Sequence, residues 1–233
     1  MSLNYSITSG PEQIEDIFNV DVTEAYRARY NACPTQLLPV ITSDNPDGLS
    51  FFYWGMNPSF VKSKTISKKL VQAPLEDIPH KASLRRYLRT QRCIIIADGF
   101  YDWKTLTKKG RTPYRFFLPD NKPFAIAGLW DSFDNEQGET IHTFMMVTTP
   151  ANGEVADITD RMPAILESDF IIEWLNDSNN TEESMLALLK PYTEYALDRY
   201  TVNPKLDDSS FDSPDLFRQV PPADQFGNLT LFG

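Results

Sequence analysis

The chain has 233 residues, of which 41% are hydrophobic, 23% charged and 12% aromatic, a composition that excludes a disordered or coiled-coil protein. Two cysteines, Cys33 and Cys93, are too few for a disulfide framework, and the two isolated histidines, His80 and His142, form no metal-binding cluster. No run approaches the roughly 20 apolar residues of a membrane span, and the first residues resemble no secretion signal. We therefore expect a cytoplasmic protein with no metal, no cofactor and no membrane partner.

The pattern of apolar residues predicts many short strands and few helices. In chain order these are a helix capped by Ser9 that reaches Phe18, strands at 37–42 and 50–54, a helix at 83–91, strands at 93–97, 114–118, 124–129 and 141–148, helices at 169–175 and 182–189, and a strand at 197–202. The turn-rich segment 43–48 joins the first two strands as a hairpin. The chain from residue 203 onward is rich in Pro, Asp and Ser, which predicts an extended tail. We therefore divide the chain into a mainly β domain, residues 1–202, and a tail, residues 203–233.

Charge is divided unevenly along the chain. The net charge is -10, which taken whole argues against a nucleic-acid partner. Between Lys62 and Arg115, however, 14 residues are basic and 4 are acidic, whereas the rest of the chain has 8 basic and 28 acidic residues. This division is typical either of solvated faces whose signs happen to cluster or of a basic groove that holds a phosphate backbone.

Several separated motifs resemble the SOS-response-associated peptidase (SRAP) family, the abasic-site processing proteins. The motifs are RYNACPTQ at residues 29–36, WGMNPSF at 54–60, RC at 92–93, ADGFYDWK at 97–104, AGLW at 127–130, TT at 148–149, AN at 151–152 and RMPAIL at 161–166. The resemblance covers residues 4 to about 202. It implies one α+β domain around a β-barrel-like core, with a positively charged channel for single-stranded DNA that accepts abasic sites.

The resemblance also implies a reaction centre, and this chain departs from it. In the family, removal of the first methionine exposes a cysteine whose thiol and α-amine capture the abasic-site aldehyde as a thiazolidine, assisted by Asn, Glu and His side chains. Here the corresponding residues are Ser2, Gln72, Asp102 and Thr159. Pro74 stands where the family has an arginine, and Leu3 and Asn4 replace a Gly-Arg pair.

These replacements weaken the expected chemistry. A serine hydroxyl needs an adjacent base to become a nucleophile, and Thr159 is no base. Cys33 and Cys93 lie in a turn motif and an apolar strand, where small buried residues are common, so neither is a good substitute for the missing thiol. The α-amine of Ser2 has an ordinary pKa of about 7.7 and could still form a Schiff base. We therefore take Ser2 and Asp102 as the candidate catalytic residues and expect any crosslink to be reversible.

The residues that line the family's DNA channel are better preserved. They are Asn31, Pro34, Trp54, Gln72, Thr148 and Arg161. Trp54 could stack on a base or belong to the core, and Arg161 could hold a phosphate with a bidentate fork. The basic side chains of residues 62–69 and of the predicted helix at 83–91 would add sequence-independent attraction, although the lysines could equally form a solvated loop.

The last residues, QFGNLTLFG at 225–233, resemble the C-terminal peptides that dock bacterial replication proteins on the sliding clamp. Leu229, Leu231 and Phe232 would enter a surface pocket of the clamp, although Asn228 replaces the usual glutamine. The alternative is a tail that packs against its own domain.

Three functions remain open from the sequence. The first is a nucleoid-associated protein of the SOS response that binds single-stranded or abasic-site DNA, with impaired covalent activity. The second is an active abasic-site crosslinking enzyme with autoproteolytic, peptidase-type activity. The third is a protein-interaction module whose acidic body meets another protein.

Overall fold

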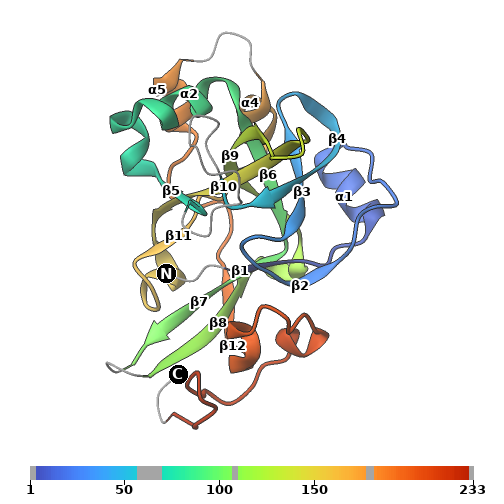
Figure 1. Ribbon diagram of the computed structural model, residues 1–233. Coiled ribbons are helices and arrows are strands. Elements are labelled where there is room, and N and C mark those ends of the chain that lie inside the picture. Colours follow the sequence, from blue (N-terminus) through green and yellow to red (C-terminus); the bar gives the residue numbers. More distant parts are fainter. Residues whose placement is uncertain (1–3, 57–69, 107–109, 177–180, 231–233) are drawn as a thin grey trace.

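A closed β-barrel lies at the centre of the protein. The structure is a computed structural model that describes residues 4–56, 70–106, 110–176 and 181–230. The barrel strands are β3 (Leu37–Thr42), β4 (Asn45–Trp54), β6 (Arg92–Ala97), β9 (Phe124–Asp134) and β10 (Thr140–Pro150). Each strand pairs with the next, and β10 pairs with both β9 and β4, which closes the ring (Figure 1). Two short strands, β5 (Gln72–Pro74) and β11 (Arg161–Pro163), pair with the far end of β10.

A second sheet lies below the barrel in Figure 1. Its strands, in spatial order, are β12 (Asp198–Thr201), β8 (Arg111–Phe117), β7 (Gly99–Thr105), β1 (Asn4–Ile7) and β2 (Arg29–Ala32). Because only Asp98 separates β6 from β7, the chain passes directly from the barrel into this sheet. Neighbouring strands in it are antiparallel.

Short helices surround the two sheets. They are α1 (Pro11–Phe18), α2 (Ala82–Thr90), α3 (Gly153–Ala156), α4 (Ile171–Leu175) and α5 (Glu182–Ala187), with 3₁₀ turns η1 (Leu75–His80), η2 (Pro119–Asn121), η3 (Ser168–Phe170), η4 (Pro204–Asp207) and η5 (Pro214–Phe217). In α1, Pro11 stands in the first turn, and Ile14 and Phe18, four residues apart, form the buried face. The helix ends at Asn19, which adopts the left-handed conformation (φ 53°). In the described part of the chain, no helix is long and apolar enough to cross a membrane.

The predicted fold class is confirmed: the protein is an α+β domain with a β-barrel core. Strand β3 has the predicted bounds, and the other predicted strands and helices each overlap an observed element. The sequence pattern missed β1, β2, β5, β7 and β11. Four of these strands have only three or four residues, too few for an apolar periodicity to stand out.

A buried ion pair fixes the junction between the two sheets. Arg115 of β8 is fully buried and lies 3.7 Å from the carboxylate of Asp98. Asp98 also accepts hydrogen bonds from the Ser6 hydroxyl (2.6 Å) and the Ser9 backbone amide (2.9 Å). A Cβ on Gly99 would lie 2.9 Å from Nε of Arg115, so the close approach of this arginine requires glycine there. Arg115 is therefore a structural residue.

The segment after β12 differs from the extended tail that its composition predicts. Leu206 and Leu216 are buried in a small second core with Tyr101 and Trp103 of β7. The Asp212 carboxylate accepts hydrogen bonds from the backbone amides of Tyr30 (2.6 Å) and Asn31 (3.0 Å). A few apolar residues and one carboxylate thus hold a polar segment in place, which average composition does not reveal.

Candidate functional site

The candidate site is centred on Asp102 in β7. Tyr101 and Trp103 pack against the C-terminal segment, so the alternation of a strand directs Asp102 to the opposite face of the sheet. Its side chain is 2% exposed. Oδ1 accepts a hydrogen bond from the backbone amide of Trp103 (2.8 Å), and Oδ2 is buried with no partner among the described residues.

Burial changes the protonation of this carboxyl. Loss of solvation raises the pKa of Asp102 from 3.8 to about 6, and the Trp103 amide, the Thr159 hydroxyl and the charge of Arg111 oppose that rise. Thr159 and Asp102 are thus neighbours, although they are distant in the sequence. The structure therefore brings together two of the positions that the family resemblance assigned to the reaction centre.

The described chain begins beside Asp102. Asn4, the first residue of β1, lies opposite Tyr101 in the antiparallel pair of β1 and β7. Ser2, the predicted amine and hydroxyl donor, lies outside the described residues.

Asn31 and Cys33 lie on the other face of this sheet, where both are buried. The Asn31 side chain accepts a hydrogen bond from Nδ2 of Asn4 (2.8 Å) and donates to the backbone carbonyls of Leu206 (3.3 Å) and Phe211 (3.1 Å). The C-terminal segment therefore covers Asn31. Burial raises the pKa of the Cys33 thiol to about 12, so the thiolate needed for a nucleophile does not form at neutral pH.

Cys93 is excluded for the same reason. It is fully buried in β6, and loss of solvation raises the pKa of its thiol. No group of three or more His, Cys, Asp or Glu side chains that could hold a metal occurs in the described ranges.

Three of the predicted DNA-binding residues meet at one end of β10. Gln72 of β5 pairs with Met146 of β10. Thr148, two residues further along β10, lies opposite Pro74 of β5 and Pro163 of β11. Arg161 of β11 donates from Nε to the Thr148 hydroxyl (3.2 Å) and from a terminal nitrogen to the Thr148 carbonyl (2.7 Å).

The guanidinium fork of Arg161 already has a partner. It forms two hydrogen bonds to the carboxylate of Glu76, of 3.2 and 2.9 Å. These bonds lower the pKa of the Glu76 carboxyl, whose side chain is 52% exposed. A phosphate that binds Arg161 bidentately must displace Glu76, and an exposed ion pair of this kind is weak enough to exchange.

Trp54 and Pro34 differ in exposure. Trp54 is fully buried, donates from Nε1 to the carbonyl of Val71 (2.8 Å) and packs in parallel against Phe144, with 6.1 Å between ring centroids. Its indole has no face open to a base, which fits the core alternative. Pro34 is half-buried.

Several basic residues between Lys62 and Arg115 are buried or paired with carboxylates. Arg115 and Arg92 are fully buried, and Arg92 donates to backbone carbonyls that include those of Trp174 (2.6 Å) and Asn176 (2.8 Å). On α2, Arg86 pairs with Asp131 and Arg89 pairs with Glu182. The lysines at positions 62, 64, 68 and 69 lie outside the described residues. Part of the local excess of positive charge therefore serves to stabilise the fold.

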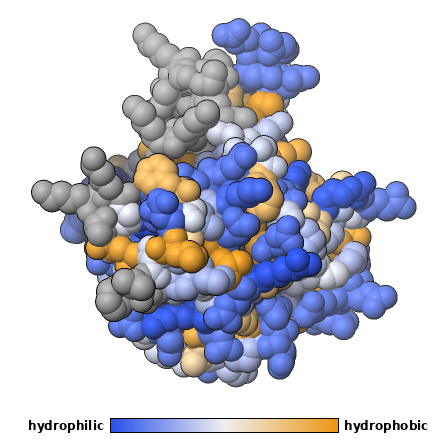
Figure 2. All heavy atoms as spheres, turned by 90° about the horizontal axis from the view of Figure 1, so that it is seen from below, coloured by the Kyte–Doolittle hydropathy of each residue, from blue (hydrophilic) through white to orange (hydrophobic). Residues whose placement is uncertain are grey.

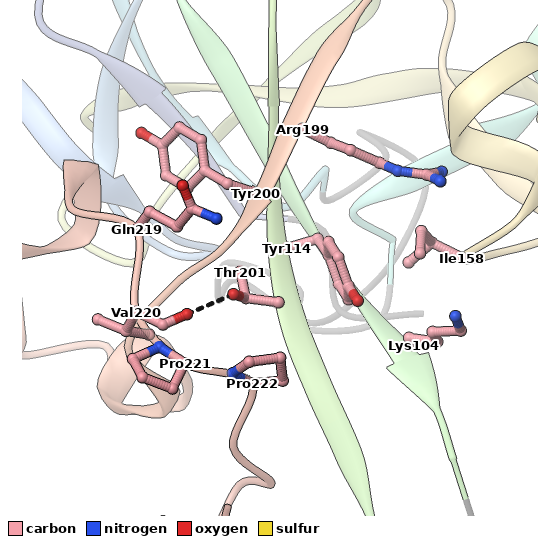
Figure 3. A pocket seen from close by; sticks show the side chains of 10 residues that line it. All are labelled: Lys104, Tyr114, Ile158, Arg199, Tyr200, Thr201, Gln219, Val220, Pro221 and Pro222. Carbon is pink, nitrogen blue, oxygen red and sulfur yellow. Dashed lines mark hydrogen bonds between the residues drawn. The ribbon is translucent and has the colours of Figure 1, made fainter. Parts of the chain in front are cut away.

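A cavity of about 550 Å³ is lined by neighbours of Asp102 and Thr159, although not by these two residues themselves. Figure 3 shows its lining, which includes Lys104, Tyr114, Ile158 and Arg199. Lys104 follows Asp102 on the same face of β7, Tyr114 lies opposite Asp102 in β8, and Ile158 precedes Thr159. The sequence analysis missed these residues, although the two-residue repeat of a strand could have identified Lys104.

The C-terminal peptide forms a tight turn at the lower end of the molecule. The Asp224 amide donates to the Asn228 carbonyl (2.8 Å), and Gly227 has a φ of +83°. Phe226 and Leu229 are 74% and 77% exposed. Figure 2 shows this end as a mostly hydrophilic face crossed by a hydrophobic band. Leu231 and Phe232 lie outside the described residues.

Known proteins resemble this chain over most of its length. The sequence model described as SOS response associated peptidase (SRAP) matches residues 1–209. The abasic site processing protein YoaM of Bacillus subtilis is 36% identical over 203 residues, which are 85% of this chain and 89% of that protein. YoqW, a second abasic site processing protein of that species, is 34% identical over 216 residues, covering 91% and 96%. A crystal structure of a protein from Bacteroides thetaiotaomicron superposes with a TM-score of 0.81 at 26% identity, covering 93% of this chain and 99% of that one.

Proposed function

We propose that this chain, which belongs to the SOS response associated peptidase (SRAP) family, binds single-stranded DNA that contains abasic sites and captures them only reversibly. The relatives named abasic site processing proteins support the substrate class. The environment of the reactive groups supports the claim that capture is only reversible. The buried Asp102 is next to Thr159, where the family has histidine, and the two cysteines are buried with raised thiol pKa values.

The residual reaction is imine formation at the N-terminus. With Met1 removed, the unprotonated α-amine of Ser2 attacks the aldehyde carbon of the ring-opened abasic sugar, and a carbinolamine forms. Loss of the hydroxyl as water, with a proton supplied by an acid, gives the C=N bond. The Asp102 carboxyl, with a pKa of about 6, exchanges protons near neutral pH and is the acid we assign to this step.

The imine does not become a stable ring adduct. A cysteine thiol closes a thiazolidine on the imine carbon, whereas the serine hydroxyl is the weaker nucleophile and has no histidine to take its proton. Water therefore hydrolyses the imine and releases the DNA. The second candidate is an active crosslinking enzyme with peptidase-type autoproteolysis, and the raised pKa of Asp102 is the observation that favours it.

We assign DNA binding to the surface around β5, β10 and β11. Gln72, Thr148 and Arg161 lie together there, and Arg161 holds a phosphate when Glu76 is displaced. Pro34 is retained from the family's channel. Asn31 and Trp54 are buried, and we assign them to the framework rather than to direct contact with DNA.

Docking on a replication sliding clamp is a further part of the proposal. The exposure of Phe226 and Leu229 in the C-terminal turn supports it, because a docking peptide must present its apolar side chains. The clamp would bring the protein to exposed single strands during the SOS response.

Native-gel titrations of a single-stranded oligonucleotide test the binding proposal. The oligonucleotide carries one non-reactive abasic analogue, and the salt concentration is varied. We expect binding that weakens with salt, and Arg161→Gln reduces the salt slope by about one. Arg218→Gln is the matched control, because Arg218 is an exposed arginine that also pairs with a carboxylate. Absence of binding by the unchanged protein would remove the DNA function and leave the protein-interaction module.

A further inference from the structure

Among the described helices, the most exposed large apolar side chain lies far from the candidate site. Ile172 of α4 is 81% exposed, although the next residue but one, Trp174, is fully buried. Ile17, at the end of α1, is 42% exposed. Large apolar side chains exposed side by side on a protein surface usually mark a contact with another molecule.

These two residues line one groove. A cavity of about 570 Å³ lies between α1, the hairpin turn that joins β3 and β4, and α4. Its apolar lining consists of Ile17, Phe18, Pro46, Ile171, Ile172 and Leu175. A second cavity of about 300 Å³ shares Ile17, Phe18 and Ile171 with the first and continues to Tyr195, which is 57% exposed. The groove is thus long enough for several consecutive side chains of a peptide.

The edges of the groove are acidic. Asp47 lines it, and Asp16, Asp169 and Glu173, all exposed, are adjacent in sequence to Ile17, Ser168 and Ile172 of the lining. Lys122 is the basic residue that lines the second cavity. This charge repels nucleic acid and anionic lipid and attracts a cationic chain.

Two other occupants fit poorly. In a symmetric dimer, identical acidic edges would face each other across the contact. The chain's own C-terminal peptide is held by the Asp224–Asn228 turn at the opposite end of the molecule (Figure 1).

We propose that the groove between α1 and α4, the α1–α4 groove, binds a basic amphipathic segment of a partner protein. Its apolar side chains fill the two joined cavities, and its lysine or arginine side chains pair with the acidic edges. The site is distinct from the Asp102 site and independent of DNA binding, so one protein can hold a partner and a strand at once.

Selection from a phage-displayed random peptide library tests the proposal. The wild-type protein is the target, and Ile172→Asp is the counter-target; Ile172 is exposed, so its replacement leaves the fold intact. We expect enriched peptides that combine spaced apolar residues with lysine or arginine and bind wild type at least tenfold more tightly than Ile172→Asp. Leu37→Asp is the control, since it introduces the same charge at an exposed leucine of β3 that lies outside the groove and has no assigned binding role.

Charge provides the second arm of the test. The double variant Asp47→Asn, Glu173→Gln should weaken the selected peptides severalfold and flatten their salt dependence. Enrichment of acidic peptides, or equal binding to Ile172→Asp, would overturn the proposal. So would a concentration-dependent dimer in sedimentation that Ile172→Asp abolishes, since the groove would then be a contact between copies. A library that yields no enrichment over the counter-target would also contradict it.

Discussion

Replacement of Asp102 by asparagine should stabilise the protein, and more so as the pH rises. The carboxyl is 2% exposed, and burial raises its pKa from 3.8 to about 6. Below pH 4 the group is protonated in both the folded and the unfolded chain, so it does not lower the free energy of unfolding. Between pH 4 and pH 6 the unfolded chain ionises and the folded chain does not, which lowers the free energy of unfolding. Above pH 6 both states are ionised, and the free energy of unfolding falls no further on account of Asp102.

The size of this effect follows from the shift. About two pKa units at 1.36 kcal/mol each correspond to about 3 kcal/mol for a group that solvent does not screen. Asparagine keeps the shape and the acceptor for the Trp103 amide but carries no charge. The difference in unfolding free energy between Asp102→Asn and wild type should therefore rise by about 3 kcal/mol from pH 3.5 to pH 7.

Urea denaturation followed by tryptophan fluorescence measures this difference at a series of pH values. Other groups titrate equally in both proteins, so the difference between the two unfolding free energies isolates the contribution of Asp102. Asp44→Asn, which makes the same substitution in an exposed turn, is the matched control. A flat or falling difference for Asp102→Asn would refute the claim that burial controls this carboxyl.

Four further results are expected. Leu216→Ala should cost about 2–5 kcal/mol in urea denaturation, because the leucine is fully buried under β7; a cost near zero would mean that the C-terminal segment does not pack there. Glu76→Gln should free Arg161 and tighten single-stranded DNA binding in native gels, and unchanged binding would contradict the assigned phosphate contact. Cys33 should resist iodoacetamide in the native protein and react on unfolding, as mass spectrometry can show. Deletion of residues 225–233 should abolish pull-down by the sliding clamp, and unchanged pull-down, or none from the full chain, would remove clamp docking.

The barrel could be predicted from the sequence because its strands carry long apolar runs. Residues 93–97 are all buried, and an uninterrupted apolar run is the pattern of a strand covered on both faces. Strand β7 was missed because glycine and aspartate, which strands generally avoid, occupy Gly99 and Asp102. Gly99 allows the close approach of Arg115, and Asp102 is the candidate catalytic residue.

The candidate site was only partly predictable. Motif resemblance identified Asp102 and Thr159, whereas their cavity-lining neighbour Tyr114 depends on strand register, which places it opposite Asp102. Charge counting does not distinguish the buried Arg92 from an exposed arginine, so it could not say which basic residues are available at the surface. The burial of Trp54 also needed the structure, since a tryptophan that ends a strand suits either the core or a ligand face.

A denaturing gel tests the central claim most directly. Single-stranded DNA with one natural abasic site is incubated with the protein and with Ser2→Cys, each with and without borohydride. We expect the Ser2 protein to give a shifted band only with borohydride, which reduces the imine, and Ser2→Cys to give more adduct without reductant. A heat-resistant band from the Ser2 protein without borohydride would contradict the account, because the chain would then form a stable crosslink by another route.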